Sequence, residues 1–377
     1  MPVNARSMKK GRKKVVTLSD IAQKANLSKG AVSFALKNSP MVSEKTRKMV
    51  QALAKSMGYE KNQLVSTLMS KIRAGSEKSF SETIAVINGN LDEHALRRHP
   101  TLPRYYEGIR EESERLGYAI NEFWMHAPGI TPDKLSKIFH SRGIRGGIVL
   151  GHSFGNEFPK GYEKIWHDFY FVSAGIRTYN ASLEVVASDD FLISHNAYVE
   201  AASLGCKNIG LVIDESVDDL VGGTLVGGFL RAQLKGGAKF KCPPFLEPRE
   251  SKTYRKNLAK WIRKNSPDAI LYLFNFTRGI LEEIPEVGRR NVRLFQLERR
   301  EPPPPDWTGM EQNNDVVGKV AVRRLADMLN RDSAVAGENS GIITLVRPTW
   351  VGGGEAAKDA HARPTMPARP RKAKRAK

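Results

Sequence analysis

Cysteine is scarce in this chain of 377 residues, which contains only Cys206 and Cys242. Two cysteines are too few for a disulfide framework or for a zinc site built from cysteine ligands. No apolar run is long enough to span a membrane, and the amino terminus lacks the apolar core of a secretion signal. These absences predict a cytoplasmic protein with no membrane partner.

Acidic residues are also in short supply, since 40 aspartates and glutamates face 60 lysines and arginines, for a formal net charge of +20. An imbalance of this size favours a polyanionic partner, and nucleic acid comes first. Two basic segments, residues 1–15 and 354–377, have few large apolar residues to bury, so disorder is expected in both. They would strengthen nonspecific contacts with phosphates, although the second tail is equally compatible with a role in solubility.

The motifs of common enzymes are missing as well. The chain has no P-loop, no HExxH, no Gly-x-Ser-x-Gly, and its eight histidines are scattered. We therefore expect no enzyme, no metal site and no cofactor. An apolar content of 40% suffices for proper cores, and the length suits a small headpiece followed by a larger body of two lobes.

The most informative stretch is residues 16–59, whose apolar spacing predicts three short helices with a tight turn between the first two. Asn26 falls at that turn, and asparagine tolerates the left-handed conformation better than most residues. Ser28 and Ser43 stand where the second and third helices need amino-terminal caps. The outward residues at the front of the second helix are small, charged or aromatic. This pattern is typical of a helix-turn-helix unit that enters the major groove.

A gap-free series of motifs runs through the same stretch. They are Val16-Thr17-Leu18, Asp20-Ile21-Ala22, Ala25-Asn26-Leu27-Ser28, Val32-Ser33, Val42-Ser43, Thr46-Arg47 and Gly58-Tyr59. With these motifs the segment resembles the DNA-binding headpiece of the LacI/GalR (lactose-repressor) family of transcriptional regulators. The alternative is a small helical bundle with no role on DNA.

The resemblance implies which residues touch DNA. Lys29, Gly30 and Phe34 occupy the base-reading positions: the lysine donates to a guanine or a phosphate, and the phenylalanine makes only apolar contacts, for instance with a thymine methyl. Few direct contacts with base edges are therefore expected, so that recognition depends more on the shape of the DNA. The family's phosphate contacts fall on Leu18, Ser28, Ser33, Lys37, Ser43, Thr46, Tyr59 and Asn62.

A hinge is expected at residues 60–82. In the family this linker folds on the operator, and paired leucines from two subunits wedge into the minor groove. Leu68 falls on the wedge position, although it is also compatible with packing against the body. Lys61 replaces the usual proline, so the stiffening that a proline gives is lost.

Residues 83–353 alternate short β-branched runs with amphipathic stretches. Strands are expected at residues 83–87, 118–124, 147–150, 169–173, 185–187, 209–213, 269–274, 292–297 and finally 342–345, and helices at 106–116, 132–141, 194–203, 227–234, 258–264 and 317–330. This alternation predicts parallel sheets with helices on both faces. The resemblance to the family then implies the fold class, which is an all-α helix-turn-helix headpiece plus an α/β body of two lobes similar to periplasmic sugar-binding proteins. The second half of the body is expected to begin with the strand at 209–213. The helix after Gln312 is expected to match a helix of the family's second lobe.

A cleft for a small-molecule effector is implied by the family, but two of its signals are missing or displaced. The family's effector arginine lies three residues before a Gly-aromatic pair, here Gly228-Phe229, and that position holds Leu225. Glu298 stands near the position of its effector aspartate. The remaining candidates, each also compatible with a structural role, are Tyr105, Tyr106 and Trp124 for stacking, and Asp190, Asn275, Glu298 and Gln312 for polar contacts.

The sequence therefore predicts a bacterial transcription regulator, most simply a repressor, that binds a pseudo-palindromic operator as a homodimer. It would be nucleoid-associated when bound to DNA, and a sugar or a derivative would modulate its affinity. Two alternatives remain open. One is a basic protein that coats DNA without sequence preference, and the other is a sugar-binding module that does not recognise an operator.

Overall fold

The computed structural model describes residues 18–36, 39, 42–57, 82–151, 156–176, 178, 181, 183–236, 242–300, 303, 306–330 and 341–352. The two basic segments, nearly all of the expected hinge and the wedge residue Leu68 lie outside these ranges. The chain divides into two compact units. Unit 1 consists of the chain up to Ala187 together with Asn314–Thr344. Unit 2 comprises Ser188–Asn313 and the chain from Leu345 onward.

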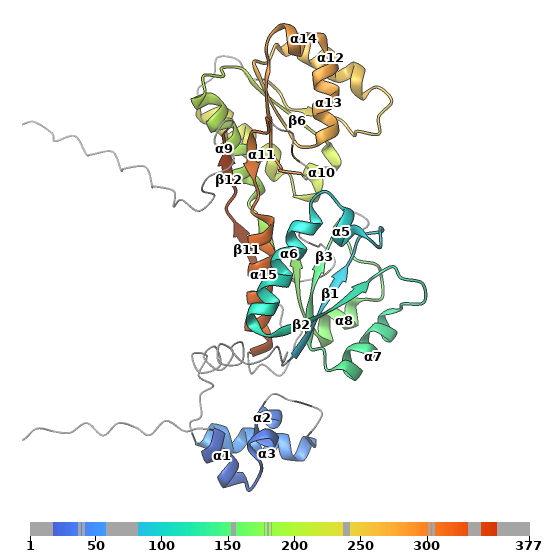
Figure 1. Cartoon of the computed structure of the whole chain (residues 1–377), viewed down its shortest axis with the longest axis vertical. Helices are drawn as coiled ribbons and strands as arrows, with labels where there is room; N and C mark the ends of the chain where they lie inside the picture. Colours follow the sequence, from blue (N-terminus) through green and yellow to red (C-terminus); the bar gives the residue numbers. More distant parts are fainter. Residues whose placement is uncertain are drawn as a thin grey trace, which may run out of the picture. The chain divides into compact units, whose positions relative to one another are not determined.

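The headpiece consists of three helices, α1 (Leu18–Ala25), α2 (Lys29–Leu36) and α3 (Glu44–Ser56) (Figure 1). Asn26 adopts the expected left-handed conformation with φ of 55°, and the amide of Leu27 donates to the carbonyl of Ala22 at 3.0 Å. The turn therefore reverses the chain directly after α1. The core of the headpiece is formed by Ile21, Ala22, Val32, Ala35, Val50 and Ala54. The predicted helix-turn-helix arrangement is confirmed.

Unit 1 contains a sheet with the strand order β11-β5-β4-β3-β1-β2. Its strands are β1 (Glu82–Asn88), β2 (Tyr118–Trp124), β3 (Gly146–Leu150), β4 (Tyr170–Ala174), β5 (Glu184–Ser188) and β11 (Ile343–Val346). Its helices are α5 (Ala95–Arg98), α6 (Leu102–Leu116), α7 (Pro132–Arg142), α8 (Glu163–Asp168) and α15 (Asn314–Asn330). Ala85 and Ile87 of β1 pack with α7 and α8, whereas α6 and α15 lie against the sheet on its other face. Alternate residues of one strand thus serve two helical layers.

Unit 2 repeats this plan with the strand order β12-β10-β9-β8-β6-β7, in which only β12 is antiparallel to its neighbour β10 among the pairs recorded. The strands are β6 (Ile209–Ile213), β7 (Phe245–Leu246), β8 (Ala269–Tyr272), β9 (Arg293–Gln296), β10 (Gly309–Glu311) and β12 (Thr349–Val351). The helices are α9 (Asp190–Ser203), α10 (Glu215–Leu220), α11 (Thr224–Lys235), α12 (Tyr254–Asn265), α13 (Asn275–Glu283) and α14 (Pro285–Arg289). Leu211 faces α9 and α11, while its neighbour Val212 faces α12, α13 and α14. No helix within the described ranges has the length and hydropathy of a membrane span.

Three expectations about the body were wrong. Unit 2 opens at Ser188, before α9, rather than at the strand that begins with Ile209. The strand at 342–345 is not the last, because β12 follows it. The helix after Gln312, α15, belongs to unit 1 and not to the second lobe. In each case the element is placed by pairing with distant parts of the chain, which a local pattern does not reveal.

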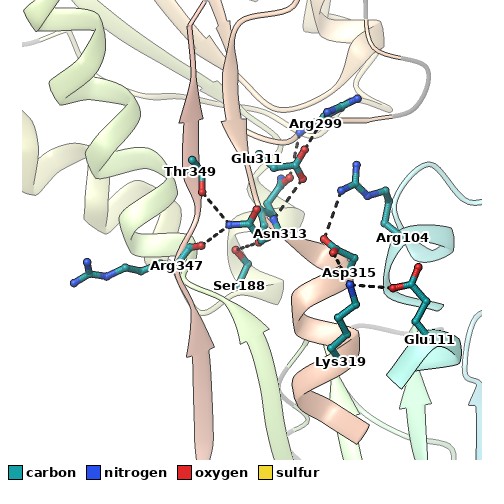
Figure 2. A network of polar contacts seen from close by, with 11 residues as sticks. Arg104, Glu111, Ser188, Arg299, Glu311, Asn313, Asp315, Lys319, Arg347 and Thr349 are labelled. Atoms are coloured by element: carbon teal, nitrogen blue, oxygen red, sulfur yellow. Dashed lines mark hydrogen bonds and ion pairs between the residues drawn. The ribbon is translucent and has the colours of Figure 1, made fainter. Parts of the chain in front are cut away.

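The chain consequently passes between the units three times, after Ala187, after Asn313 and after Thr344. On the side of unit 2 these segments are joined by a polar clamp (Figure 2). The side-chain amide of Asn313 donates to the carbonyl of Arg347 at 2.8 Å and to Oγ1 of Thr349 at 3.0 Å. The hydroxyl of Ser188 donates to the carbonyl of Gln312 at 3.2 Å. Asn313 has a φ of 59°, so its backbone turns sharply immediately before α15.

On the side of unit 1, the position of α15 depends on two glycines. A Cβ at Gly318 would overlap the carbonyl oxygen of Tyr105, and one at Gly108 would overlap that of Asp315. The helices α6 and α15 therefore approach through their backbones. Lys319 adds ion pairs to Glu111 at 3.0 Å and to Asp315 at 3.3 Å (Figure 2).

Gly318→Ala is expected to lower the free energy of unfolding by about 1–3 kcal/mol, because the added methyl forces two backbones apart. Urea unfolding followed by circular dichroism measures this loss. Gly227→Ala in α11 is the matched control, since a Cβ there meets nothing within 4 Å. It should leave stability unchanged or raise it slightly. Equal effects of the two substitutions would contradict the close approach of α6 and α15.

Candidate nucleic-acid interface and ligand site

The predicted base-reading residues lie together on the exposed front of α2. Lys29 and Gly30 are exposed, and Phe34 keeps 44% of its surface accessible. Val32 and Ala35 are fully buried, so helical periodicity directs Phe34 away from the core. A Cβ at Gly30 would meet only the Ser28 hydroxyl, at 3.9 Å, so packing does not require a glycine there. The exposed front of α2 is therefore small and mainly apolar, and Lys29 is its one cation among the three predicted base-reading residues.

Two of the predicted phosphate-contact residues cap helices. Oγ of Ser28 accepts from the amide of Ala31 at 3.1 Å, at the start of α2. Oγ of Ser43 accepts from the amide of Thr46 at 3.3 Å, at the start of α3, and lies 2.9 Å from the Thr46 hydroxyl. Such capped ends present further first-turn amides, which suit phosphate oxygens. A role on DNA for these three residues stays a prediction.

Of the other five predicted phosphate-contact residues, the structure describes only two. Leu18 begins α1, where its amide is one of the first-turn donors, and Ser33 is half-buried on α2. Lys37, Tyr59 and Asn62 lie outside the described residues.

In unit 1 the three aromatic candidates have separate surroundings. Tyr105 is buried, whereas the hydroxyl of Tyr106 donates to the carboxylate of Glu122. Arg97 binds the same carboxylate at 2.8 and 2.9 Å and lies 5.7 Å from the centroid of the Tyr106 ring. Burial, followed by the contact with Glu122, raises the pKa of Tyr106 to about 12. Trp124 donates from its indole nitrogen to the carbonyl of Asn90 at 3.0 Å.

Among the candidates in unit 2, Gln312 and Asn275 have partners within the fold. Gln312 is buried; its Oε1 accepts from the amide of Arg299 at 3.1 Å and its Nε2 donates to the carbonyl of Leu297 at 3.2 Å. The side chain thus ties the segment after β9 to the end of β10. Asn275 is exposed, and its Oδ1 accepts from Nε2 of Gln296 at 2.7 Å.

A cluster of rings and cations beside Glu298 escaped the sequence reasoning. The rings of Phe274 and Phe276 stack at 5.2 Å, and the guanidinium of Arg300 lies 4.3 Å from the centroid of Phe274. Arg249 lies 6.0 Å from both rings, and Arg300 also pairs with Glu298. Phe274 and Glu298 follow the ends of β8 and β9, at the edge where α/β sheets bind ligands. The sequence signal is Phe274-Asn275-Phe276, but the predicted strand at 269–274 includes Phe274, whereas β8 ends at Tyr272.

Asp190 differs from the carboxylates around it. Asp189 accepts from the amide of Leu192, Asp218 accepts from two amides at the start of α11, and Glu298 pairs with Arg300. Within the part of the chain that the structure describes, the side chain of Asp190 has no hydrogen bond or ion pair. Burial, and then the charges of Glu298, Asp189 and Asp218, raise the pKa of Asp190 to about 7. Its carboxyl group is therefore free to bond a ligand hydroxyl.

The position of the family's effector arginine is closed to solvent. Leu225 is 3% exposed and packs in the core of unit 2. A Cβ at Gly228 would overlap the carbonyl oxygen of Phe191, so this glycine allows α11 to approach α9 closely. Phe229 is fully buried in contact with Tyr198. The Gly-aromatic pair thus serves packing between helices here.

The headpiece matches a known sequence family. Residues 17–62 fit the model for "Bacterial regulatory proteins, lacI family". The chain is 32% identical over 138 residues to "HTH-type transcriptional regulator MalR" of Staphylococcus xylosus. It is 33% identical over 91 residues to "Probable HTH-type transcriptional repressor ExuR" of Bacillus subtilis (strain 168). These alignments cover 36% and 21% of this chain, and 38% and 27% of the relatives, so the chain matches well under half of each relative's length.

Solved structures share the fold over most of the chain. The "transcriptional regulator CelR-cellobiose complex" aligns with a TM-score of 0.51 at 16% identity, over 90% of this chain and 99% of that one. The "transcription regulator CcpA of Lactococcus lactis" aligns with a TM-score of 0.51 at 14% identity, over 72% of this chain and 98% of that one. Residues 17–62 thus match the lacI family of bacterial regulatory proteins, and the body has the same fold as these solved regulators. The family is one of transcription regulators rather than enzymes.

The raised pKa of Asp190 predicts how stability depends on pH. Its ordinary value is 3.8 and its folded value is about 7. Between about pH 4 and about pH 7 the unfolded chain has lost a proton that the folded chain keeps, so this group's contribution to stability falls as pH rises. Asp190→Asn removes this loss and should stabilise the protein more at about pH 8 than at about pH 5.

Unfolding in urea at the two pH values measures the difference between wild type and variant. Asp133→Asn is the control, because Asp133 is an exposed carboxylate in the first turn of α7. If Asp190→Asn changes stability by the same amount at both pH values, the carboxyl group does not retain its proton in the folded protein.

Proposed function

We propose that this protein is a sequence-specific transcription regulator, acting as a repressor, that binds a pseudo-palindromic operator as a homodimer. The observation that carries the proposal is the face of α2, where Lys29 and Phe34 project from a closed helical core in a LacI-family domain. A two-fold dimer presents two such faces, so the operator has matched half-sites. We place its activity in the bacterial cytoplasm, at the nucleoid.

The body supplies the control in this proposal. A small molecule, a sugar or a derivative of one, binds unit 2 at the carboxyl edge of its sheet, beside Asp190, Glu298 and Phe274. Support comes from the exposed ring of Phe276, which stacks on Phe274, and from the Asp190 carboxyl group, which has no partner in the described structure. The CelR structure, which has the same fold, is a complex with cellobiose. The ligand would favour one of two conformational states and so change operator affinity.

Selection from random duplex DNA tests the proposal. Purified full-length protein is incubated with the pool at roughly physiological salt, where nonspecific phosphate binding is suppressed. The expected result is an enriched site with two-fold symmetry. If no sequence is enriched and binding disappears as salt rises, the protein coats DNA without preference. If no DNA is bound while a sugar raises the thermal stability, the protein is a binding module without an operator.

Phe34 is expected to recognise thymine methyl groups within the selected site. Phe34→Ala should weaken operator binding by about 1 kcal/mol per half-site, a fraction of what full burial of a phenylalanine contributes. Replacing the contacted thymine by uracil, which lacks the methyl group, should weaken wild type equally and leave the variant unaffected. Fluorescence anisotropy with both duplexes measures these affinities.

The control for this substitution is Met49→Ala. Met49 is 47% exposed on α3, so the variant removes a similar apolar surface outside the reading helix. It should bind the operator and its uracil form as wild type does. A uracil effect that persists in Phe34→Ala would show that another group contacts the methyl.

A further inference from the structure

Helix α12 of unit 2 has an unusual charge composition. Its twelve residues, Tyr254–Asn265, include five basic residues and no acidic residue. Tyr254, Leu258 and Ile262 are buried on one side and pack with α13 and α14 against the sheet. The basic residues are therefore confined to the remaining surface of the helix. Figure 1 shows α12 beside α13 and α14 in unit 2.

The two arginines of α12 are engaged within the fold. Arg255 pairs with Glu283 at the end of α13. Arg263 pairs with Glu286 of α14 at 3.2 Å. Both arginines thus tie α12 to its neighbours through Glu283 and Glu286.

The three lysines of α12, Lys256, Lys260 and Lys264, have no such role. They recur at every fourth residue, which places them along one side of the helix about 6 Å apart. All three are exposed, and none has a hydrogen bond or an ion pair with any residue that the structure describes. Like charges at this spacing repel each other, so the stripe is unfavourable until an anion lies along it.

The type of cation indicates the type of anion. Carboxylates on a protein partner are best held by the planar fork of arginine, and both arginines of this helix are already paired. A lysine ammonium is a point charge with freely turning donors, which suits phosphates met at variable positions. The net charge of +20 makes a polyanion the favoured partner of the whole chain.

We propose that the lysine stripe of α12 contacts the phosphate backbone of duplex DNA without regard to sequence. It forms a second DNA-binding surface, carried by unit 2 and separate in the chain from the helix-turn-helix. This contact adds nonspecific affinity and does not depend on an operator or on an effector.

The experiment compares full-length variants on a duplex of random sequence. The stripe variant is Lys256→Ala/Lys260→Ala/Lys264→Ala. The matched control, Lys137→Ala/Lys160→Ala/Lys164→Ala, removes three exposed lysines of unit 1 and the same total charge. A third variant, Lys256→Arg/Lys260→Arg/Lys264→Arg, keeps the charge of the stripe. Anisotropy titrations over a series of salt concentrations give the slope of log affinity against log salt.

Each phosphate contact contributes about 0.9 to this slope, so the stripe variant should have a slope smaller by about 2–3 than wild type. The unit 1 control and the arginine variant should keep the wild-type slope. Equal slopes in the stripe and control variants, or no binding of random duplex by wild type, overturn the proposal. Unchanged thermal unfolding of the stripe variant ensures that a lower slope reflects DNA contact. Because the duplex contains no operator, the outcome is independent of the site selection that tests the regulator.

Discussion

The architecture depends on the polar clamp at the border of unit 2. Ser188, Gln312 and Asn313 lie where the chain leaves this unit, and Asn313 holds the segment that precedes β12 through Arg347 and Thr349. The chain crosses between the two units three times rather than once. Any conformational change between the units must therefore be accommodated by all three connecting segments together. In the proposed regulator, this connection would convert a change at the ligand site of unit 2 into a defined movement. An effector that acts on DNA binding needs a defined movement of this kind.

The sequence was sufficient for most of the framework because the signals involved are local. β2 at Tyr118–Trp124 and β6 at Ile209–Ile213 have the predicted bounds, and the headpiece follows its apolar spacing and the turn at Asn26. Elements held by distant partners were not predictable. The short β12 exists because it pairs with β10, and α15 joins unit 1 because Gly108 and Gly318 allow it to approach α6.

The same distinction applies to the sites. The reading face of α2 was predictable, since it belongs to one short helix whose inner and outer residues follow from periodicity. The ring and cation cluster of unit 2 was not, because Arg249, Phe274 and Arg300 come from three separate loops. The position of Glu298 in the chain makes it a candidate, but its pairing with Arg300 is visible only in the fold. Periodicity reveals which side of an element faces outward, and it does not reveal which loops meet.

A weak capacity for direct readout has consequences for the whole molecule. Gly30 offers no side chain although there is space for one, and Phe34 has no hydrogen-bond donor. Lys29 is therefore the only one of the three predicted base-reading residues whose side chain can donate to a base edge. Affinity must then come mainly from phosphates, which the capped ends of α2 and α3 and a chain charge of +20 are suited to supply. Phosphate contacts strengthen binding to every sequence equally, so they do not improve discrimination. In the proposed regulator, selectivity would rest on the predicted apolar contacts of Phe34, on the deformability of the DNA and on the spacing of two half-sites.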